Sequence, residues 1–480
     1  MQNSCDILIK NSLVVLPTIG VTETNIMIEN GKIKKLVKSL QNISYDKEIN
    51  ANNKYVIPGV IDPHVHYGVY TSIDKASLTE SRSAAIGGVT TMFRMLRLDK
   101  SYRSNIQEQL NASKNVHYVD YSIHPSILKK IHLDDLEYLC NIIGLNSFKI
   151  YLNLGHKLNH IHMDLDPNET LHKSGFVNID DQFLDKIVET ISRYNSTLLV
   201  HAEDPEMCYN HIKREQDNEK INSNPDTYNM LKKWSDCRPY ASEVNSIKKI
   251  ADLARTYACS IYFVHIGSNA AIDAIIKERE KGGCNLYVET CPHYLTHSYD
   301  YNNLKGKVVP PLRSKEDVSS IWNALRNGMI DTVGTDHVAN NLKLKIHNND
   351  LWKSLAGFPG LATLLPVLLS EGVNKGRINI QKLSEITSYN ASRIFDLYPK
   401  KGTLLEGSDA DLVIIDLNME KKVDPDLLQS FSDYSIYDEW TLKGWPILTM
   451  VRGKVIMQDF TIDKNYLGHG EFLSHINNKM

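Results

Sequence analysis

Residues 60–66 read Val-Ile-Asp-Pro-His-Val-His (VIDPHVH), an apolar run that ends in polar side chains. β-branched residues favour a strand, and positions i and i+2 of a strand point to the same face. His64 and His66 are therefore expected to converge on one point. Because α/β barrels place their chemistry at the carboxyl ends of their strands, this segment predicts the first strand of a barrel and one edge of its site.

Apolar β-runs and longer helical segments alternate downstream of residue 66. Residues 180–195 and 241–258 are examples of the helical segments. Repeated β-then-α units imply a parallel sheet, and eight strands favour a closed (β/α)8 TIM barrel. The seven further runs are VTTMFRM (89–95), YVDYSIH (118–124), SFKIYLN (147–153), TLLVHAED (197–204), SIYFVHIG (260–267), NLYVETC (285–291) and DTVGTDH (331–337).

Both ends of the chain have a different pattern of short β-runs and tight turns. Asn30-Gly31 separates two such runs near the start, which is a hairpin signal, and an Arg-Gly-Lys turn interrupts ILTMVRGKVIMQ (447–458) near the end. We therefore expect a small β-sandwich domain formed by both termini. The expected divisions are 1–57 and 401–480, including a tail, for this domain and 58–400 for the barrel. Residues 152–176 are polar and irregular, and we expect a long loop over the site that could act as a lid.

Composition limits the class of partner. The 480 residues carry a net charge of −3, so nothing attracts nucleic acid or an anionic membrane broadly, and a small-molecule partner is expected. The chain has neither a run of about 20 apolar residues nor the apolar core of a signal peptide. Seven dispersed cysteines favour reduced thiols. The sequence therefore predicts a cytoplasmic protein.

Polar side chains end several of the later strands too. Lys149, His201, His265 and Asp336 each follow an apolar run. A single buried histidine is more often a hydrogen-bonded core residue than a metal ligand. The joint pattern differs, because several imidazoles with a carboxylate form a ligand set suited to zinc or a similar divalent cation. The sequence therefore predicts a metal site.

These segments carry a family resemblance that covers nearly the whole chain. The motifs, in order, are DPHVH, SFKIY, HAED, FVHIG, ETCPHYL, PPLR, GTDH, GFPGL and YPKKGTLLEGSDADLVIID. The chain resembles the cyclic amidohydrolases, namely dihydropyrimidinases (hydantoinases), allantoinases and dihydroorotases. The resemblance implies a TIM barrel with a β-sandwich, a homodimer or homotetramer, and an enzyme that hydrolyses C–N bonds in a small cyclic amide or ureide.

The resemblance also implies a centre of two divalent metal ions, with zinc the first expectation and manganese or iron also suited. A hydroxide that bridges the two ions would open the ring, and Asp336 would act first as general base and then as general acid. The implied ligands are His64, His66 and Asp336 on one ion, His201 and His265 on the other, and N6-carboxylated Lys149 between them.

The positions expected to contact substrate depart from each known branch. Dihydroorotases carry an arginine after HxH and an MPN motif, where this chain has Tyr67-Gly68-Val69 and Arg94-Met95-Leu96-Arg97. The tyrosine that dihydropyrimidinases place after the lysine is replaced by Leu154, with Tyr151 out of register. Their PNGGP segment and the Ser-Pro of allantoinases are also absent.

Arg97, and Arg94 to a lesser degree, could bind an acidic or strongly polar substrate group. The alternative is a surface salt bridge with Asp99 or Glu80. The remaining candidates for substrate contact are Tyr151, Thr290, Cys291 and His337, the last of which could instead orient Asp336.

Three alternatives to ring opening remain open. The same machinery could act on an acyclic amide, or close a ring in a specialised pathway. The chain could also be a non-catalytic family member used as a scaffold, although such members typically lose metal ligands and all six positions are present here.

Overall fold

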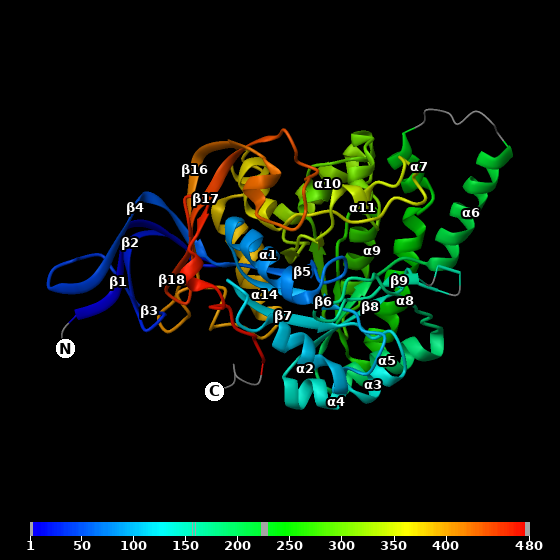
Figure 1. Ribbon diagram of the computed structural model, residues 1–480, viewed down its shortest axis with the longest axis horizontal. Helices are drawn as coiled ribbons and strands as arrows, with labels where there is room; N and C mark the ends of the chain where they lie inside the picture. The colour runs from blue at the N-terminus through cyan, green and yellow to red at the C-terminus, as the bar shows by residue number, and fades with distance from the viewer. Residues whose placement is uncertain (1–2, 156, 159, 222–228, 476–480) are drawn as a thin grey trace.

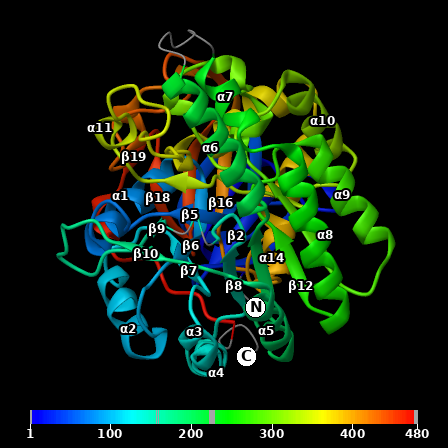
Figure 2. The same cartoon turned by 90° about the vertical axis from the view of Figure 1, so that its right-hand side faces the viewer.

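The computed structural model describes residues 3–155, 157–158, 160–221 and 229–475. Its centre is a barrel of parallel strands, shown end-on in Figure 2. One group of hydrogen-bonded strands has the order β15-β5-β6-β7 and the other β14-β13-β12-β11-β8. A parallel bridge between Ser126 and Lys149 links β7 to β8. The bounds are β5 (Val60–His66), β6 (Val89–Leu96), β7 (Asp120–Pro125), β8 (Ser147–Tyr151), β11 (Thr197–His201), β12 (Ser260–Phe263), β13 (Leu286–Thr290), β14 (Thr332–Val333) and β15 (His337–Val338).

The eighth strand of the barrel is interrupted. Its first half, β14, pairs with β13, and its second half, β15, pairs with β5, so residues 332–338 complete the ring. Asp336 lies at the interruption with a φ of 50°, in the left-handed region that a regular strand excludes. The break therefore removes Asp336 from the alternation of the strand and lets its side chain face the barrel end.

Helices surround the strands, as the sequence pattern predicted (Figures 1 and 2). Helix α5 shows why they pack there: Asp180 caps its first turn by accepting from the Phe183 amide, and Phe183, Ile187 and Ile191 share one buried face. The principal helices are α1 (Ile73–Ile86), α2 (Tyr102–Ser113), α5 (Asp181–Arg193), α6 (Pro205–Ile221), α7 (Met230–Asp236), α8 (Tyr240–Tyr257), α9 (Asn269–Glu280), α10 (Lys315–Arg326), α11 (Leu342–Lys345), α12 (Leu364–Val367), α13 (Ile380–Ser384) and α14 (Asn390–Ile394).

Both ends of the chain form one sheet beside the barrel (Figure 1). Its order is β19-β18-β17-β16-β4-β1-β2-β3, and β4 pairs with β16 antiparallel, which joins the two termini. This confirms the predicted β-domain, while its boundaries at residues 57 and 400 stay predictions. The strands are β1 (Asn3–Leu16), β2 (Gly20–Glu29), β3 (Lys32–Val37), β4 (Ile43–Pro58), β16 (Leu412–Lys422), β17 (Thr441–Val451), β18 (Lys454–Gln458) and β19 (Thr461–Ile462).

Residues 152–176, which we call the insertion, contain regular structure that the sequence pattern did not predict. Strands β9 (His160–His162) and β10 (Ser174–Phe176) pair antiparallel. The Leu165 amide donates to the Gly68 carbonyl at 2.7 Å, which fixes the insertion to the chain that follows β5. In Figure 2 the hairpin lies across the barrel end nearest the viewer. Positions 156 and 159 lie outside the described residues.

Candidate metal centre

Three predicted ligands converge at the end of β5. The ligand atoms of His64, His66 and Asp336 all lie within 4.8 Å of one another. Asp336 Oδ1 is 3.3 Å from His64 Nε2 and 3.2 Å from His66 Nε2. All three side chains are buried. One carboxylate and two imidazoles in this arrangement can hold one divalent cation.

The other predicted ligands lie beside this group. The ring of His265 is 5.4 Å from that of His64 and 4.4 Å from that of His201, centroid to centroid. Lys149, on β8, is fully buried, and burial lowers the pKa of its amine to about 7. The barrel therefore gathers all six positions, from five separate strand ends, at one end of its axis.

Two carboxylates that the sequence reasoning missed hold the imidazoles. Glu289 Oε1 is 2.7 Å from His64 Nδ1, and Glu203 Oε2 is 2.7 Å from His201 Nε2. An imidazole that donates from one nitrogen presents a lone pair at the other, which is how metal-binding histidines are commonly oriented. The available signal was a glutamate ending a buried strand, in NLYVETC and TLLVHAED.

Unpartnered atoms test whether these side chains fit a cation. Within the described chain, three buried nitrogens of the predicted ligands have no hydrogen-bond partner: His64 Nε2, His265 Nδ1 and Lys149 Nζ. Buried polar atoms rarely stay unsatisfied, and such a cluster of nitrogen donors is costly without a ligand. The donor set therefore fits bound metal.

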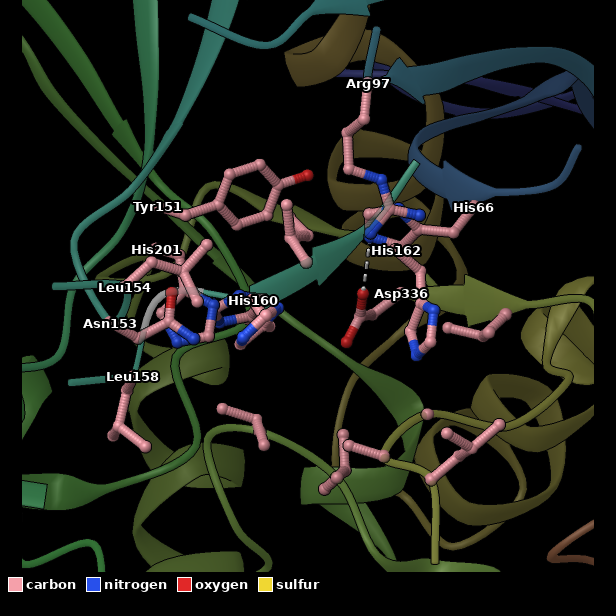
Figure 3. Close-up of a pocket in the computed structure, with 18 of the residues that line it drawn as sticks. His66, Arg97, Tyr151, Asn153, Leu154, Leu158, His160, His162, His201 and Asp336 are labelled. Carbon is pink, nitrogen blue, oxygen red and sulfur yellow. Dashed lines mark ion pairs between the residues drawn. The ribbon is translucent and has the colours of Figure 1, made fainter. Parts of the chain in front are cut away.

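The cluster forms the floor of a cavity of about 480 Å³ (Figure 3). The insertion supplies one wall, through residues that include Asn153, Leu154, His160 and His162. Residues 352–357 supply another, and Tyr70 and Arg97 also line the cavity. The volume suits a small ring compound with a modest substituent.

The predicted substrate contacts divide into two groups. Arg97 and Tyr151 line the cavity. The other four are buried outside its lining. Arg94 donates to Gln109 Oε1 at 3.1 Å, and Thr290 donates to the Ile266 carbonyl at 2.7 Å. Cys291 is fully buried, and His337 Nε2 lies 3.0 Å from Glu80.

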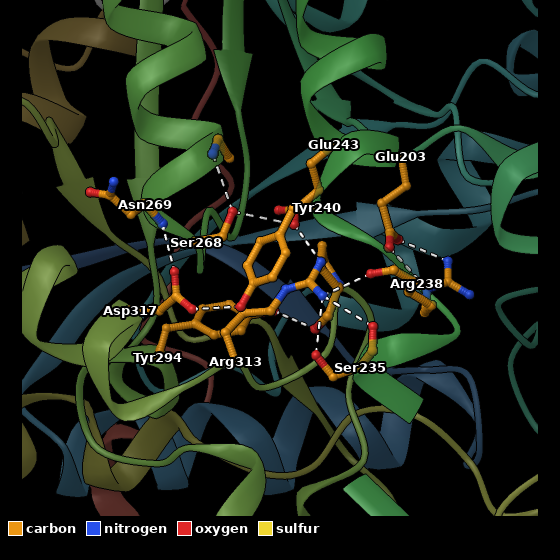
Figure 4. A network of polar contacts seen from close by, with 12 residues as sticks. Glu203, Ser235, Arg238, Tyr240, Glu243, Ser268, Asn269, Tyr294, Arg313 and Asp317 are labelled. Atoms are coloured by element: carbon orange, nitrogen blue, oxygen red, sulfur yellow. Dashed lines mark hydrogen bonds and ion pairs between the residues drawn. The ribbon is translucent and has the colours of Figure 1, made fainter. Parts of the chain in front are cut away.

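Glu203, which contacts His201, belongs to a buried ionic network (Figure 4). Arg238 donates two hydrogen bonds to Glu203, at 2.9 and 2.8 Å, so its charge is matched by the carboxylate that orients His201. Arg313 donates to Glu243 at 2.5 Å. Burial alone would raise the pKa of Glu203, but the charge of Arg238 and the contact with His201 outweigh it and hold the pKa at about 2. Glu203 is therefore ionised and available to orient His201.

The fold and this cluster define a class, a (β/α)8 hydrolase with a metal centre at its strand ends. Residues 161–456 match the model of the amidohydrolase family. D-hydantoinase of Geobacillus stearothermophilus is 30% identical, with 94% of this chain and 93% of that protein covered. L-hydantoinase of Paenarthrobacter aurescens is 29% identical, with 98% of each covered.

Solved structures agree with these relatives. The structure titled L-hydantoinase (dihydropyrimidinase) from Arthrobacter aurescens superposes with a TM-score of 0.87 at 28% identity, covering 98% of this chain and 100% of that chain. The chain therefore belongs to the amidohydrolase family, whose members are metal-dependent, and within it to the cyclic amidohydrolases, enzymes that act on C–N bonds. No helix among the described residues is long and apolar enough to cross a membrane.

Proposed function

We propose that this enzyme opens a hydantoin-like or dihydropyrimidine-like ring by hydrolysis of a cyclic amide bond, using two metal ions. The observation that carries the proposal is the convergence of four histidines, Lys149 and Asp336 on the floor of one small cavity. The names of the relatives support the ring class.

His64, His66 and Asp336 would hold one ion, and His201 and His265 the other. Two divalent cations would supply an activated water and polarise the scissile carbonyl. Lys149 would bridge them as its N6-carbamate, because burial lowers the pKa of its amine to about 7 and a carbamate forms on a neutral amine. Zinc suits this set, and manganese or iron are alternatives.

Asp336 would carry out the proton transfers. It is the carboxylate that lines the cavity among the described residues, and it faces both His64 and His66. In the proposed reaction its carboxylate takes the proton of the attacking water and returns it to the ring nitrogen that leaves. Arg97 and Tyr151 would contact the substrate. A cytoplasmic location and a homodimeric or homotetrameric state stay predictions.

Ring opening by metal-loaded enzyme on hydantoins and dihydropyrimidines tests the proposal. We expect turnover of at least one ring class and a loss of about 1,000-fold or more in Asp336→Asn, because removing a positioned acid–base group alone costs about 100- to 10,000-fold. Asp252→Asn, the same change at an exposed position of α8, is the matched control. Absence of turnover on every ring, with two metals bound per chain, would contradict the proposal.

A further inference from the structure

Arg97 follows the end of β6 and faces the cavity. Only 9% of the residue is exposed, and Figure 3 shows its side chain extending from the backbone toward His66 and Asp336. Arg97 lines the same cavity as the predicted metal ligands, so its guanidinium can face a substituent of a ring bound there. The inference below rests on the proposed function and deepens it by naming the substrate class.

The cavity lining is rich in cations. Five cationic side chains line it, against the single carboxylate of Asp336 among the described residues: Arg97, Lys149, Lys157, Arg238 and Lys353. Lys149 belongs to the metal centre, and Arg238 is neutralised by Glu203. Lys157 and Lys353 are half or more exposed and lie within 4 Å of carboxylates. Arg97 is thus the buried cation of the lining that is least neutralised by a neighbouring carboxylate.

The reason is that Arg97 shares its counter-ion. Asp164 lies 3.6 Å from Arg97 Nε and 3.8 Å from Arg94 Nη1, so one carboxylate faces two guanidiniums. Both separations exceed hydrogen-bond length, and Arg97 Nε, Arg94 Nη1 and Asp164 Oδ1 are all buried without a hydrogen-bond partner in the described chain. The trio carries a surplus positive charge, which is unfavourable in a buried position unless an anion joins it.

The insertion fixes this arrangement. Asp164 belongs to it, and its Oδ2 accepts from the Arg97 amide at 2.8 Å. The Asp164 amide donates in return to the Arg97 carbonyl at 3.0 Å. This reciprocal pair holds Asp164 beside β6 whether or not the guanidinium is engaged. Asp164 is therefore a positioning residue, and Arg97 is left free to bind a ligand from the cavity side.

We propose that Arg97 binds a carboxylate on the ring substituent of the substrate, so that the enzyme selects anionic cyclic ureides over neutral ones. The planar guanidinium can bind a carboxylate with two parallel hydrogen bonds. The position is not the one after HxH where dihydroorotases carry their arginine, since that stretch is Tyr67-Gly68-Val69 here. The preference for an anionic substrate would thus depend on the contact between Arg97, after β6, and Asp164 of the insertion.

The test compares 5-(2-carboxyethyl)hydantoin with its carboxamide, which has the same shape and no charge. Turnover and ligand binding are measured separately on the metal-loaded enzyme. We expect the wild type to favour the carboxylate in both kcat/KM and Kd, and Arg97→Gln to reduce that preference about 10- to 100-fold, the worth of a charged hydrogen bond. The loss should fall on KM more than kcat, and Arg97→Lys should restore part of it.

Arg103→Gln, the same change at an exposed position of α2 outside the cavity lining, is the matched control. It should keep the carboxylate preference. Equal use of the two compounds by the wild type, or equal loss on both in Arg97→Gln, overturns the inference. If neither ring is opened, the proposed function fails, and the ratio of the two Kd values still decides whether Arg97 binds a carboxylate.

Discussion

Two buried carboxylates decide which ring nitrogen of a histidine faces the cavity. Glu289 accepts from His64 Nδ1 and also from the Tyr262 hydroxyl and the His265 amide, so its position is fixed from three sides. Its orientation in turn fixes the His64 ring, with Nε2 toward Asp336. Glu289, which is not a predicted metal ligand, thereby sets the orientation of His64, which is one.

Changing Glu289 should therefore weaken metal binding more than it disturbs the fold. Glu289→Gln keeps the shape but replaces one of the two carboxylate oxygens, which contact His64, Tyr262 and the His265 amide, with an amide N–H₂ group. We expect metal affinity to fall about 10- to 100-fold, the usual effect of altering the partner of a ligating histidine. Chelator competition measures it, with the exposed Glu280→Gln as control. Unchanged affinity in Glu289→Gln would show that His64 is not oriented through this contact.

The sequence analysis identified site residues by their position at the ends of predicted strands. This approach misses partners that come from distant parts of the chain. His64, His66 and Asp336 meet as predicted, because barrel topology brings strand ends together. Glu289 lies 225 positions from its partner His64, and Asp164 lies 67 from Arg97. No periodicity encodes such pairs. For the same reason the predicted alternative partners of Arg97, Asp99 and Glu80, were wrong: Asp99 contacts Lys129, and Glu80 contacts His337.

At the scale of elements, short strands without a periodic pattern escaped prediction. The insertion was expected to be irregular, yet β9 and β10 form a ladder of three residue pairs. Short β-runs were expected near the start of the chain, but residues 3–16 form the single long strand β1. The strand bends at Asn11, which has a φ of 55°, where the register shifts. The polar residues here suggested that the strand ends, whereas a β-bulge accommodates them within one strand.

A second wall of the cavity depends on two buried lysines. Lys307 Nζ donates to the carbonyls of Leu351 and Ser354, and Lys345 Nζ donates to those of Lys307 and Gly357. Neither lies within salt-bridge distance of a carboxylate in the described ranges. Burial lowers the pKa of Lys307 to about 7 and that of Lys345 well below its ordinary value. These amines are therefore backbone donors more than charges.

This predicts a rise in stability with alkaline pH. The folded pKa of Lys307 is about 7 and its ordinary value 10.5, so between these values the unfolded chain binds more protons. The free energy of unfolding should then increase from pH 7 to pH 9, by at most about 1.4 kcal/mol per pH unit for one lysine. Below pH 7 this contribution stays constant.

Urea unfolding at pH 7, 8 and 9 measures the effect, and Lys307→Met should flatten the rise. The exposed Lys186→Met, on α5, should not. Parallel pH dependences in the wild type and Lys307→Met would contradict the role given to this amine.

At the scale of the whole molecule, one lysine joins the barrel to the β-domain. Lys401 Nζ lies 2.7 Å from Asp120 on β7, 2.5 Å from Asp411 and 3.2 Å from Asp409. Arg452 also pairs with Asp120. Burial would raise the pKa of Asp120, but Lys401 and Arg452 outweigh it and hold the pKa at about 2. Burial raises the pKa of Asp411 instead. Protonation in acid therefore destabilises the folded protein at Asp120 and stabilises it at Asp411.

The stabilisation from Asp120 should be present above pH 4 and lost as the pH falls toward 2, because its ordinary pKa is 3.8. We expect Asp120→Asn to lower the free energy of unfolding by about 3 kcal/mol at pH 7, since it breaks a buried ion pair. The wild type should lose about 2 kcal/mol more than the variant on acidification. Urea midpoints from pH 7 to pH 2 measure both, and an unchanged difference across this range would contradict the assignment.

The overall architecture was the most predictable level. Alternating β and α segments are repeated along the chain, so many separate segments predict the barrel. The short β-runs at both ends predict the shared terminal domain. The Asn30-Gly31 turn connects β2 and β3 as predicted, and the Arg452-Gly453 turn connects β17 and β18. The split of the eighth strand was not predicted. Gly334-Thr335-Asp336 directly follows Thr332-Val333, and these residue types do not by themselves require the left-handed backbone that Asp336 adopts.

The pairing of β4 with β16 also has a consequence for biosynthesis. About 350 residues separate the last residue of β4 from the first of β16. At roughly 5–20 residues per second, translation of that interval takes on the order of tens of seconds. Throughout it, the edge of β4 has no partner, although Val56 and Ile57 on it are fully buried in the finished protein. The nascent chain therefore carries an open, apolar strand edge until nearly the whole polypeptide has been made.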